Sequence, residues 1–274
     1  MNNILVPIDF SICCYNAFRF GLHLAEATGR NLLVVHYRTN RFSTQDAEHA
    51  VTINRMEQFV QSENHLRDFD FEELPESVKI RFEANSVDKP AAAIKERAEQ
   101  SDVDMVVMGS KTLVKTVGTW YGSTSIRVSS ACDRPVFLIP PTAKFVPFKQ
   151  VVVANSFEVA TPYPLWQIEE LAGIYQSKVH FLHIDNPDQE TSVRFTPWRL
   201  MDELAGKEPK VSYPFVVSAV SDNDISKGIL DYGQDIDASL IVVVNDLNLQ
   251  DNRVFHKTLT QIPLLVLHTE MKPA

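Results

Sequence analysis

The chain has 274 residues, a length that predicts two domains of ordinary size. Hydrophobic residues make up 45% of the sequence and charged residues 22%, and this balance excludes a chain that is disordered throughout. Acidic residues outnumber basic ones by 35 to 26, so we expect neither nucleic acid nor an anionic membrane surface as a partner.

Cysteine usage and hydropathy bear on the compartment. The chain has three cysteines, Cys13, Cys14 and Cys132, and two of them are adjacent, which excludes a disulfide framework. No apolar run approaches the roughly 18 residues that would predict a membrane span, and the opening MNNILVPIDF lacks the features of a signal peptide. We therefore expect a cytoplasmic protein with no membrane partner.

Short apolar runs alternate with longer amphipathic stretches through the first half of the chain. Several runs are apolar on both faces, a pattern typical of parallel strands that helices cover on both sides. Strands are expected at 4–8, 32–36, 78–82, 105–108 and 136–139. The predicted fold class is α/β.

Three helices are predicted between these strands. The first ends at Gly29, which stands where a C-terminal cap belongs. The second spans 46–66, and its buried face is expected to carry Val51, Met56, Phe59 and Val60. Pro90 marks the first turn of the third helix.

The second half of the chain repeats the first. Phe157 follows Phe10 by 147 residues and His183 follows His36 by the same interval, whereas Pro263 follows Pro135 by 128. A repeat of this length indicates a duplicated domain with deletions in the second copy. The proline-containing segment 140–149 is the expected boundary, which gives domains 1–141 and 149–274.

The last predicted strand of each half, 136–139 and 264–267, is apolar throughout. An exposed edge of this kind would favour aggregation. Either the two strands pair with each other and so join the domains within the chain, or each is a central strand covered on both faces. The pattern fits both arrangements equally.

The segment after the strand 105–108 has the composition of a phosphate-binding loop. Gly109 opens it, and Gly122 and Ser123 precede the next helix, so that backbone amides and a hydroxyl could approach an anion. Its charged residues up to position 127 are all basic: Lys111, Lys115 and Arg127. A solvated loop with ordinary helix capping would have the same composition.

Five segments carry a resemblance to a known family: ILVPIDFS, LLVVHY, DMVVMGS, GSTS and RPVFLIP. With the repeat, the chain resembles a tandem universal stress protein. The resemblance implies two adenine-nucleotide-hydrolase-like (Rossmann-like) domains, each a five-stranded parallel sheet of order 3-2-1-4-5 with helices on both faces. It also implies a cytoplasmic stress-response regulator or sensor that binds ATP or a related adenine nucleotide with Mg²⁺ and acts on protein partners. A duplicated chain can already contain the pairing that single-domain relatives form between subunits, so the sequence leaves open whether the chain also forms a homodimer.

The ATP-binding branch of that family shows the motif G-x2-G-x9-G-[ST]. Gly109, Gly122 and Ser123 fill three of its positions, and Thr112 stands at the position of the second glycine. If that position needs a positive φ, threonine is unfavourable there; otherwise its hydroxyl is an additional donor. The site that the resemblance implies consists of Pro7, Ile8, Asp9, Tyr37, Met108, Gly109, Thr112, Gly122, Ser123 and Thr124.

The resemblance also implies a role for each part of this site. Asp9 with its two preceding neighbours would face the adenosine, and Tyr37 would contact the base. Met108 and Gly109 would border the ribose and phosphates, and the segment 122–124 would hold the phosphate chain. Asp9 has an equally weighted alternative role as a turn or helix-capping residue.

The second copy differs at the corresponding positions. Ser156 stands at the position of Asp9 and Val244 at that of Gly109, and no glycine lies between 244 and 263. We expect a degenerate domain without a phosphate loop. His180 and His183 are not expected to form a metal pair, because an odd separation on a strand places them on opposite faces.

No motif of an efficient enzyme is present, so a binding protein is favoured over a slow ATPase. The alternative is a tandem scaffold for protein–protein interaction that binds no nucleotide.

Overall fold

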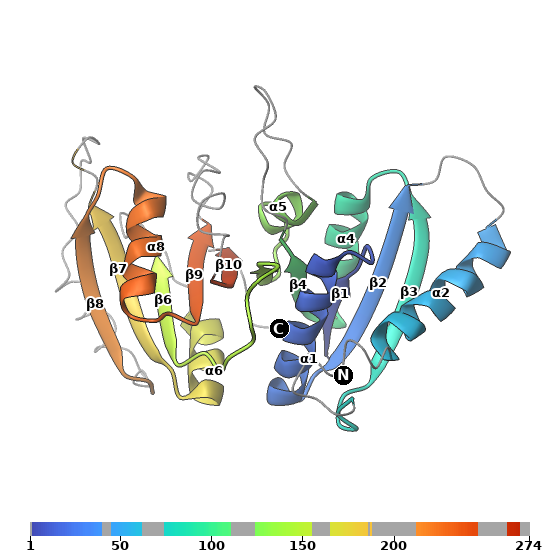
Figure 1. The fold of residues 1–274 in the computed structure, drawn as a ribbon, viewed down its shortest axis with the longest axis horizontal. Helices are drawn as coiled ribbons and strands as arrows, with labels where there is room; N and C mark the ends of the chain where they lie inside the picture. The colour runs from blue at the N-terminus through green and yellow to red at the C-terminus, as the bar shows by residue number, and fades with distance from the viewer. Residues whose placement is uncertain are drawn as a thin grey trace. The chain divides into compact units, whose positions relative to one another are not determined.

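The computed structural model describes residues 2–39, 45–61, 74–110, 124–154, 165–185, 187, 212–245 and 262–268. The chain divides into two units, Met1–Phe145 and Val146–Ala274. In each unit, parallel strands run through the middle and helices lie against their faces (Figure 1).

The sheet of the first unit has the strand order β3-β2-β1-β4-β5, which confirms the predicted topology. Its strands are β1 (Asn3–Pro7), β2 (Asn31–Thr39), β3 (Ile80–Val87), β4 (Val103–Gly109) and β5 (Val136–Ile139). β1 pairs in parallel with both β2 and β4, so the carboxyl ends of the three strands lie at one edge of the sheet. β2 and β3 run past their predicted ends into residues that are mostly polar, such as Arg38 and Asn85, and the apolar pattern does not record them.

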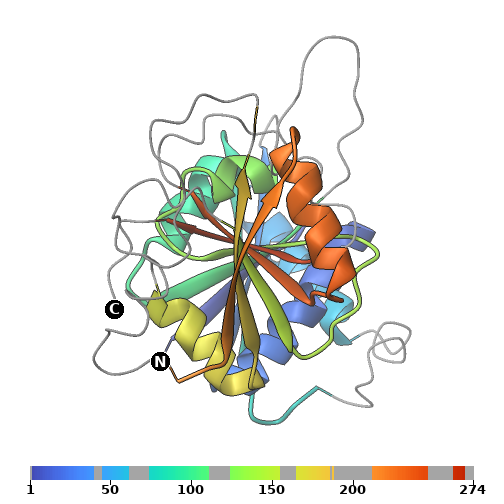
Figure 2. The ribbon, with the colours of Figure 1, turned by 90° about the vertical axis from the view of Figure 1, so that its left-hand side faces the viewer.

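The helices of the first unit are α1 (Ile12–Thr28), α2 (Gln45–Gln61), α4 (Pro90–Ala98) and α5 (Thr124–Ser129). α1 and α2 cover one face of the sheet, and α4 and α5 cover the other (Figures 1 and 2). Gly29 ends α1 at φ 65°, and its N–H donates to the carbonyl of Ala25, as the cap prediction requires. Pro90 occupies the first turn of α4, which confirms the third helix start.

The predicted buried face of α2 is wrong at one residue. Met56, Phe59 and Val60 are buried, whereas Val51 is 69% exposed. Val51 precedes Met56 by five positions, which places it about 140° away around a helix of 3.6 residues per turn. It therefore points to solvent. The part of the predicted helix after Gln61 lies outside the described residues.

The second unit has the same strand order, read as β8-β7-β6-β9-β10. Its strands are β6 (Gln150–Ala154), β7 (Lys178–Asp185), β8 (Phe215–Ser221), β9 (Leu240–Asn245) and β10 (Leu264–His268). The helices α6 (Leu165–Tyr175) and α8 (Ile225–Asp235) lie on opposite sides of these strands (Figure 2). The tandem α/β fold class is confirmed.

The duplication extends to backbone detail. The Arg30 N–H donates to the carbonyl of Ala25, and 147 residues later the Ser177 N–H donates to Ala172. Gln176, at the position that corresponds to Gly29, likewise has a positive φ of 52°. The helix that follows the first strand therefore ends in the same way in both units, although only the first unit has glycine there.

Candidate functional site

The candidate site lies at the carboxyl edge of the first sheet, where β1 and β4 are neighbours. α1, the helix after β1, covers one face of the sheet, and α5, the helix after β4, covers the other (Figure 1). In open α/β sheets this topological switch point is the usual place for a ligand, because the two connections diverge there. Asp9 follows β1, and Gly109 and Ser110 stand at the exit of β4.

Asp9 is exposed, and its carboxylate is held by the turn in which it lies. Oδ1 accepts a hydrogen bond from the Ser11 N–H at 3.0 Å and another from the Cys14 thiol at 2.9 Å. The Asp9 N–H in turn donates to Cys14 Sγ at 3.2 Å. Asp9 thus has the turn role that the sequence left open, and the same contacts orient an exposed carboxylate at the candidate site.

The next residue, Phe10, has a φ of 61°, which is uncommon for a residue other than glycine. Its ring lies 4.8 Å from that of His36 and 5.7 Å from that of Phe59, and the guanidinium carbon of Arg55 lies 4.2 Å from its centroid. These contacts pack the Phe10 ring against β2 and α2, next to the turn that contains Asp9.

Gly109 is required here by packing. A Cβ at this position would lie 2.5 Å from the carbonyl oxygen of Cys13, and no real Cβ approaches so closely. The first turn of α1 therefore rests directly on the exit of β4. The sequence suggested that this glycine admits a ligand, but the observed neighbour is the protein's own backbone.

Ser110 belongs to the site although the sequence analysis did not select it. It is only 1% exposed, and its N–H donates to the carbonyl of Ile139 at 2.9 Å. Its hydroxyl has no hydrogen-bond partner among the described residues. The signal that could have found it is its place as the last residue of the DMVVMGS segment.

Three of the expected site residues are part of the core. Pro7, Ile8 and Met108 are all buried, and the Ile8 N–H continues the sheet by donating to Val35. The Ile8 carbonyl lies 2.8 Å from Nδ1 of His36, a second residue that the sequence analysis did not place in the site. These side chains are packed in the core beneath the carboxyl edge of the sheet, so a ligand at that edge would meet their backbone groups and not their side chains.

Tyr37 is half-buried in β2, near charged residues on the α4 face of the sheet. Burial raises the pKa of its hydroxyl, and the nearby Glu83 carboxylate raises it further, while Arg97 of α4 opposes both. The phenol therefore remains protonated and able to donate. The structure thus places Tyr37 next to a charged network.

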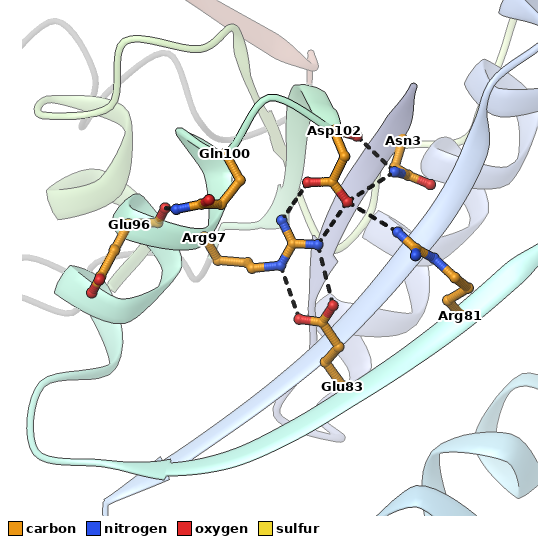
Figure 3. A network of polar contacts seen from close by, with 7 residues as sticks. All are labelled: Asn3, Arg81, Glu83, Glu96, Arg97, Gln100 and Asp102. Carbon is orange, nitrogen blue, oxygen red and sulfur yellow. Dashed lines mark hydrogen bonds and ion pairs between the residues drawn. The ribbon is translucent and has the colours of Figure 1, made fainter. Parts of the chain in front are cut away.

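That network ties α4 to the opposite, amino-terminal end of the central strands (Figure 3). Arg97 forms two hydrogen bonds with Glu83 and two with Asp102, at 2.8–3.2 Å. Its hydrogen bonds lower the pKa of Asp102 to about 2, and Arg81 acts in the same direction. Asn3 Nδ2 donates to the Asp102 carbonyl at 2.6 Å, which fixes the start of β1 against β4.

The phosphate-binding part of the expected site is not all described. Thr112, Gly122 and Ser123 lie outside the described residues, as do Lys111 and Lys115. Thr124 begins α5 and is exposed. In the described part of the chain, no three metal-ligating side chains form a group that could hold a metal ion. Among the same residues, no helix is long and apolar enough to cross a membrane.

The second unit has different chemistry at the corresponding places. Val244, at the position of Gly109, is buried in β9. Ser156 lies outside the described residues. His180 is buried, with Nδ1 3.0 Å from the Tyr232 hydroxyl and Nε2 3.0 Å from Oε1 of Gln150. Both of its ring nitrogens are therefore occupied by hydrogen bonds within the protein.

Solved structures share the architecture along the whole chain. The chain is similar to a universal stress protein from Archaeoglobus fulgidus DSM 4304, with 18% identity, 98% of each chain covered and a TM-score of 0.67. A functionally unknown protein from Pseudomonas aeruginosa PAO1 has 13% identity, with 98% of this chain and 92% of that chain covered and a TM-score of 0.58. The cytoplasmic domain of a prokaryotic cation chloride cotransporter has 9% identity, 99% and 97% coverage and a TM-score of 0.50. At these identities the likeness concerns the fold alone.

Sequence comparison gives the family. No curated protein matches the sequence. The model of the universal stress protein family matches residues 1–140, which is 140 of the 274 residues and corresponds to the first unit with its candidate site. The chain therefore belongs to the universal stress protein family.

Proposed function

We propose that the domain 1–141 binds ATP or a related adenine nucleotide at the carboxyl edge of β1 and β4, and that the chain is a nucleotide-responsive regulator of the stress response in the cytoplasm. The observation that carries the proposal is the exposed Asp9 carboxylate at the carboxyl end of β1, which is oriented by the hydrogen bonds that it accepts from the Ser11 N–H and the Cys14 thiol. A preorganised acceptor at a topological switch point is suited to a polar ligand.

The expected roles follow from position. Asp9 would accept hydrogen bonds from the adenosine, and the Gly122–Ser123 end of the motif would present backbone amides and hydroxyls to the phosphates, which Mg²⁺ accompanies. The Ser110 hydroxyl, buried and unpartnered among the described residues, stands where the phosphate segment begins. The domain 149–274 would bind no nucleotide, since valine replaces Gly109 and no glycine follows up to Pro263.

A route from the site to the rest of the chain exists within the first unit. The buried Asn16 of α1 donates from Nδ2 to the carbonyls of Pro140 and Ala143, both at 2.6 Å. The ring of Phe145 stacks on His23 of the same helix at 4.0 Å. A ligand that favours one conformation of the turn before α1 would thereby bias the segment that leads to the second unit, as population shift requires.

Isothermal titration with ATP and Mg²⁺ tests the proposal. We expect binding by the wild-type chain and its loss in Gly122→Val, in which a bulky side chain occupies the phosphate motif. Gly173→Ala is the matched control, because a Cβ at Gly173 meets nothing within 4 Å. Absence of heat at millimolar ATP would overturn the proposal.

A tandem scaffold that binds protein partners without nucleotide is the second candidate. The packing of Gly109 against Cys13 favours it, because this glycine would be needed even in a domain with no ligand. Under this function Gly122→Val changes stability at most. A slow ATPase is the third candidate, and it requires phosphate release that disappears in Asp9→Ala while the fold remains.

Assembly remains a prediction. We expect the two domains to pair within the chain and the chain to form a homodimer. Light scattering on the purified protein measures the mass directly, and a monomer would contradict the second expectation.

A further inference from the structure

Cys14 and Asp9 form a closed pair of hydrogen bonds at the carboxyl end of β1. The Cys14 thiol donates to Asp9 Oδ1 at 2.9 Å, and the Asp9 N–H donates to Cys14 Sγ at 3.2 Å. The Ser11 hydroxyl lies 3.6 Å from the same sulfur. One side chain therefore contacts both the backbone and the carboxylate of Asp9.

This arrangement needs a thiol that keeps its proton. Cys14 is 8% exposed, and burial raises the pKa of its thiol to about 12, with a further contribution from the Asp9 carboxylate. At neutral pH Cys14 therefore carries an S–H group that can donate a hydrogen bond, whereas a thiolate would repel the Asp9 carboxylate. The high pKa also makes the thiol a poor nucleophile, which argues against a redox role.

We propose that Cys14 is a positioning residue for the nucleotide site, whose thiol sets the orientation in which the Asp9 carboxylate meets the ligand. The inference rests on the proposed function and deepens it. Cys14 would then affect the affinity for nucleotide indirectly. Because the thiol already restricts the rotation of the Asp9 side chain, less conformational entropy is lost when the carboxylate binds the ligand.

The same domain provides a matched control. Cys132 is likewise buried, and burial raises the pKa of its thiol to about 11. The groups that perturb it are Arg134, Glu99, Asp133 and Lys95, and Asp9 is not among them. Cys132→Ala therefore removes a buried thiol from the first unit without touching the candidate site.

The test is a double-mutant cycle on ATP affinity. We expect Cys14→Ala to weaken ATP binding by about tenfold, the size of effect that loss of one hydrogen bond to a charged group can produce. Cys14→Ser retains a donor and should stay within about twofold of wild type. In an Asp9→Ala background Cys14→Ala should have no further effect, because the thiol acts through the carboxylate.

The control decides between positioning and general stability. Cys132→Ala should leave the ATP affinity unchanged in both backgrounds, even where it lowers the melting temperature as much as Cys14→Ala does. Equal loss of affinity in the two alanine variants would overturn the proposal. So would additive effects of Asp9→Ala and Cys14→Ala.

Hydrogen exchange separates this inference from the proposed function. The amides of Asp9 and Ser11 should exchange faster in Cys14→Ala than in wild type or Cys132→Ala, with no nucleotide present. If the wild type does not bind ATP, the proposed function fails, and the exchange rates alone decide whether Cys14 holds Asp9. Unchanged exchange in Cys14→Ala would overturn the link between the two residues.

Discussion

Gly109 at the end of β4 lies directly against the carbonyl of Cys13 in the first turn of α1. A Cβ at Gly109 would come within 2.5 Å of that oxygen and 2.6 Å of its carbon. Both obstacles are backbone atoms and cannot rotate away. The missing side chain at Gly109 therefore allows the first turn of α1 to pack directly on the end of β4.

Gly109→Ala should destabilise the first unit by about 1–3 kcal/mol, the usual range for an added methyl group in a packed interior. Chemical denaturation measures the loss. Gly173→Ala is again the control, and it should be neutral or stabilising by up to about 1 kcal/mol, because Gly173 is an exposed residue in a helix. Equal stabilities of Gly109→Ala and wild type would show that α1 can move away from β4.

The two equivalent helix ends should respond oppositely to substitution. Gly29 has a φ of 65° and open space around its Cβ position, so Gly29→Ala should cost about 1 kcal/mol through backbone strain alone. Gln176 is exposed and has a φ of 52°, so Gln176→Gly should stabilise the chain by a similar amount. Thermal unfolding checks both, and shifts of the same sign would contradict the prediction.

His180 should make the second unit sensitive to mild acid. Burial lowers the pKa of its imidazole, and the nearby Lys178 lowers it further. As the pH falls through about 6.5, His180 is protonated in the unfolded chain but stays neutral in the folded protein. The free energy of unfolding is therefore highest above that pH and decreases below it. Tyr232 and Gln150 contact the ring and supply no negative charge to offset this.

The measurement is the free energy of unfolding at pH 7.5 and pH 5.5. Below pH 6.5 the free energy of unfolding should decrease more steeply in wild type than in His180→Gln, by up to about 1.4 kcal/mol per pH unit. Identical pH dependence in the two proteins would show that His180 does not control this loss.

Arg97 should matter more to stability than Arg81, although both contact Asp102. Arg97 is partly buried and forms paired hydrogen bonds with two carboxylates, whereas Arg81 is mostly exposed and lies 3.0 Å from a single carboxylate oxygen among the described residues. After allowance for solvent screening of the half-exposed Asp102, Arg97→Gln should cost about 1–2 kcal/mol and Arg81→Gln under about 0.5 kcal/mol.

The same network gives a pH signature. Because the pKa of Asp102 is lowered to about 2, its contribution is present above pH 4 and is lost as pH falls from 4 toward 2. Arg97→Gln should flatten this part of the stability profile, as acid titrations followed by circular dichroism can show. An unchanged profile would mean that other carboxylates govern acid unfolding.

Local sequence patterns predicted most of the fold. Runs that are apolar on both faces identified the strands of a parallel sheet. Gly29 marked the end of one helix and Pro90 the start of another. The 147-residue repeat indicated a second copy of the domain, and the equivalent hydrogen bonds accepted by the carbonyls of Ala25 and Ala172 agree with it. These features depend on the period of each element and on the conformational limits of single residues. Both are properties of a few neighbouring positions.

The buried face of a helix was predicted incompletely. Val51 was assigned to the buried face of α2 and is exposed, because its spacing from Met56 does not match the helical repeat. Of the ten expected site residues, Thr112, Gly122 and Ser123 lie outside the described residues, and their part in the site stays a prediction.

The sequence by itself determined the α/β class, the strand order through its family resemblance, and Asp9 and Gly109 as residues of interest. Only the tertiary structure decided why they matter: Gly109 admits the backbone of Cys13, and Asp9 is held by the thiol of Cys14. Periodicity records how a segment folds locally. Contacts between the end of one strand and the helix that follows another arise from packing, and they appear only when segments distant in the chain come together.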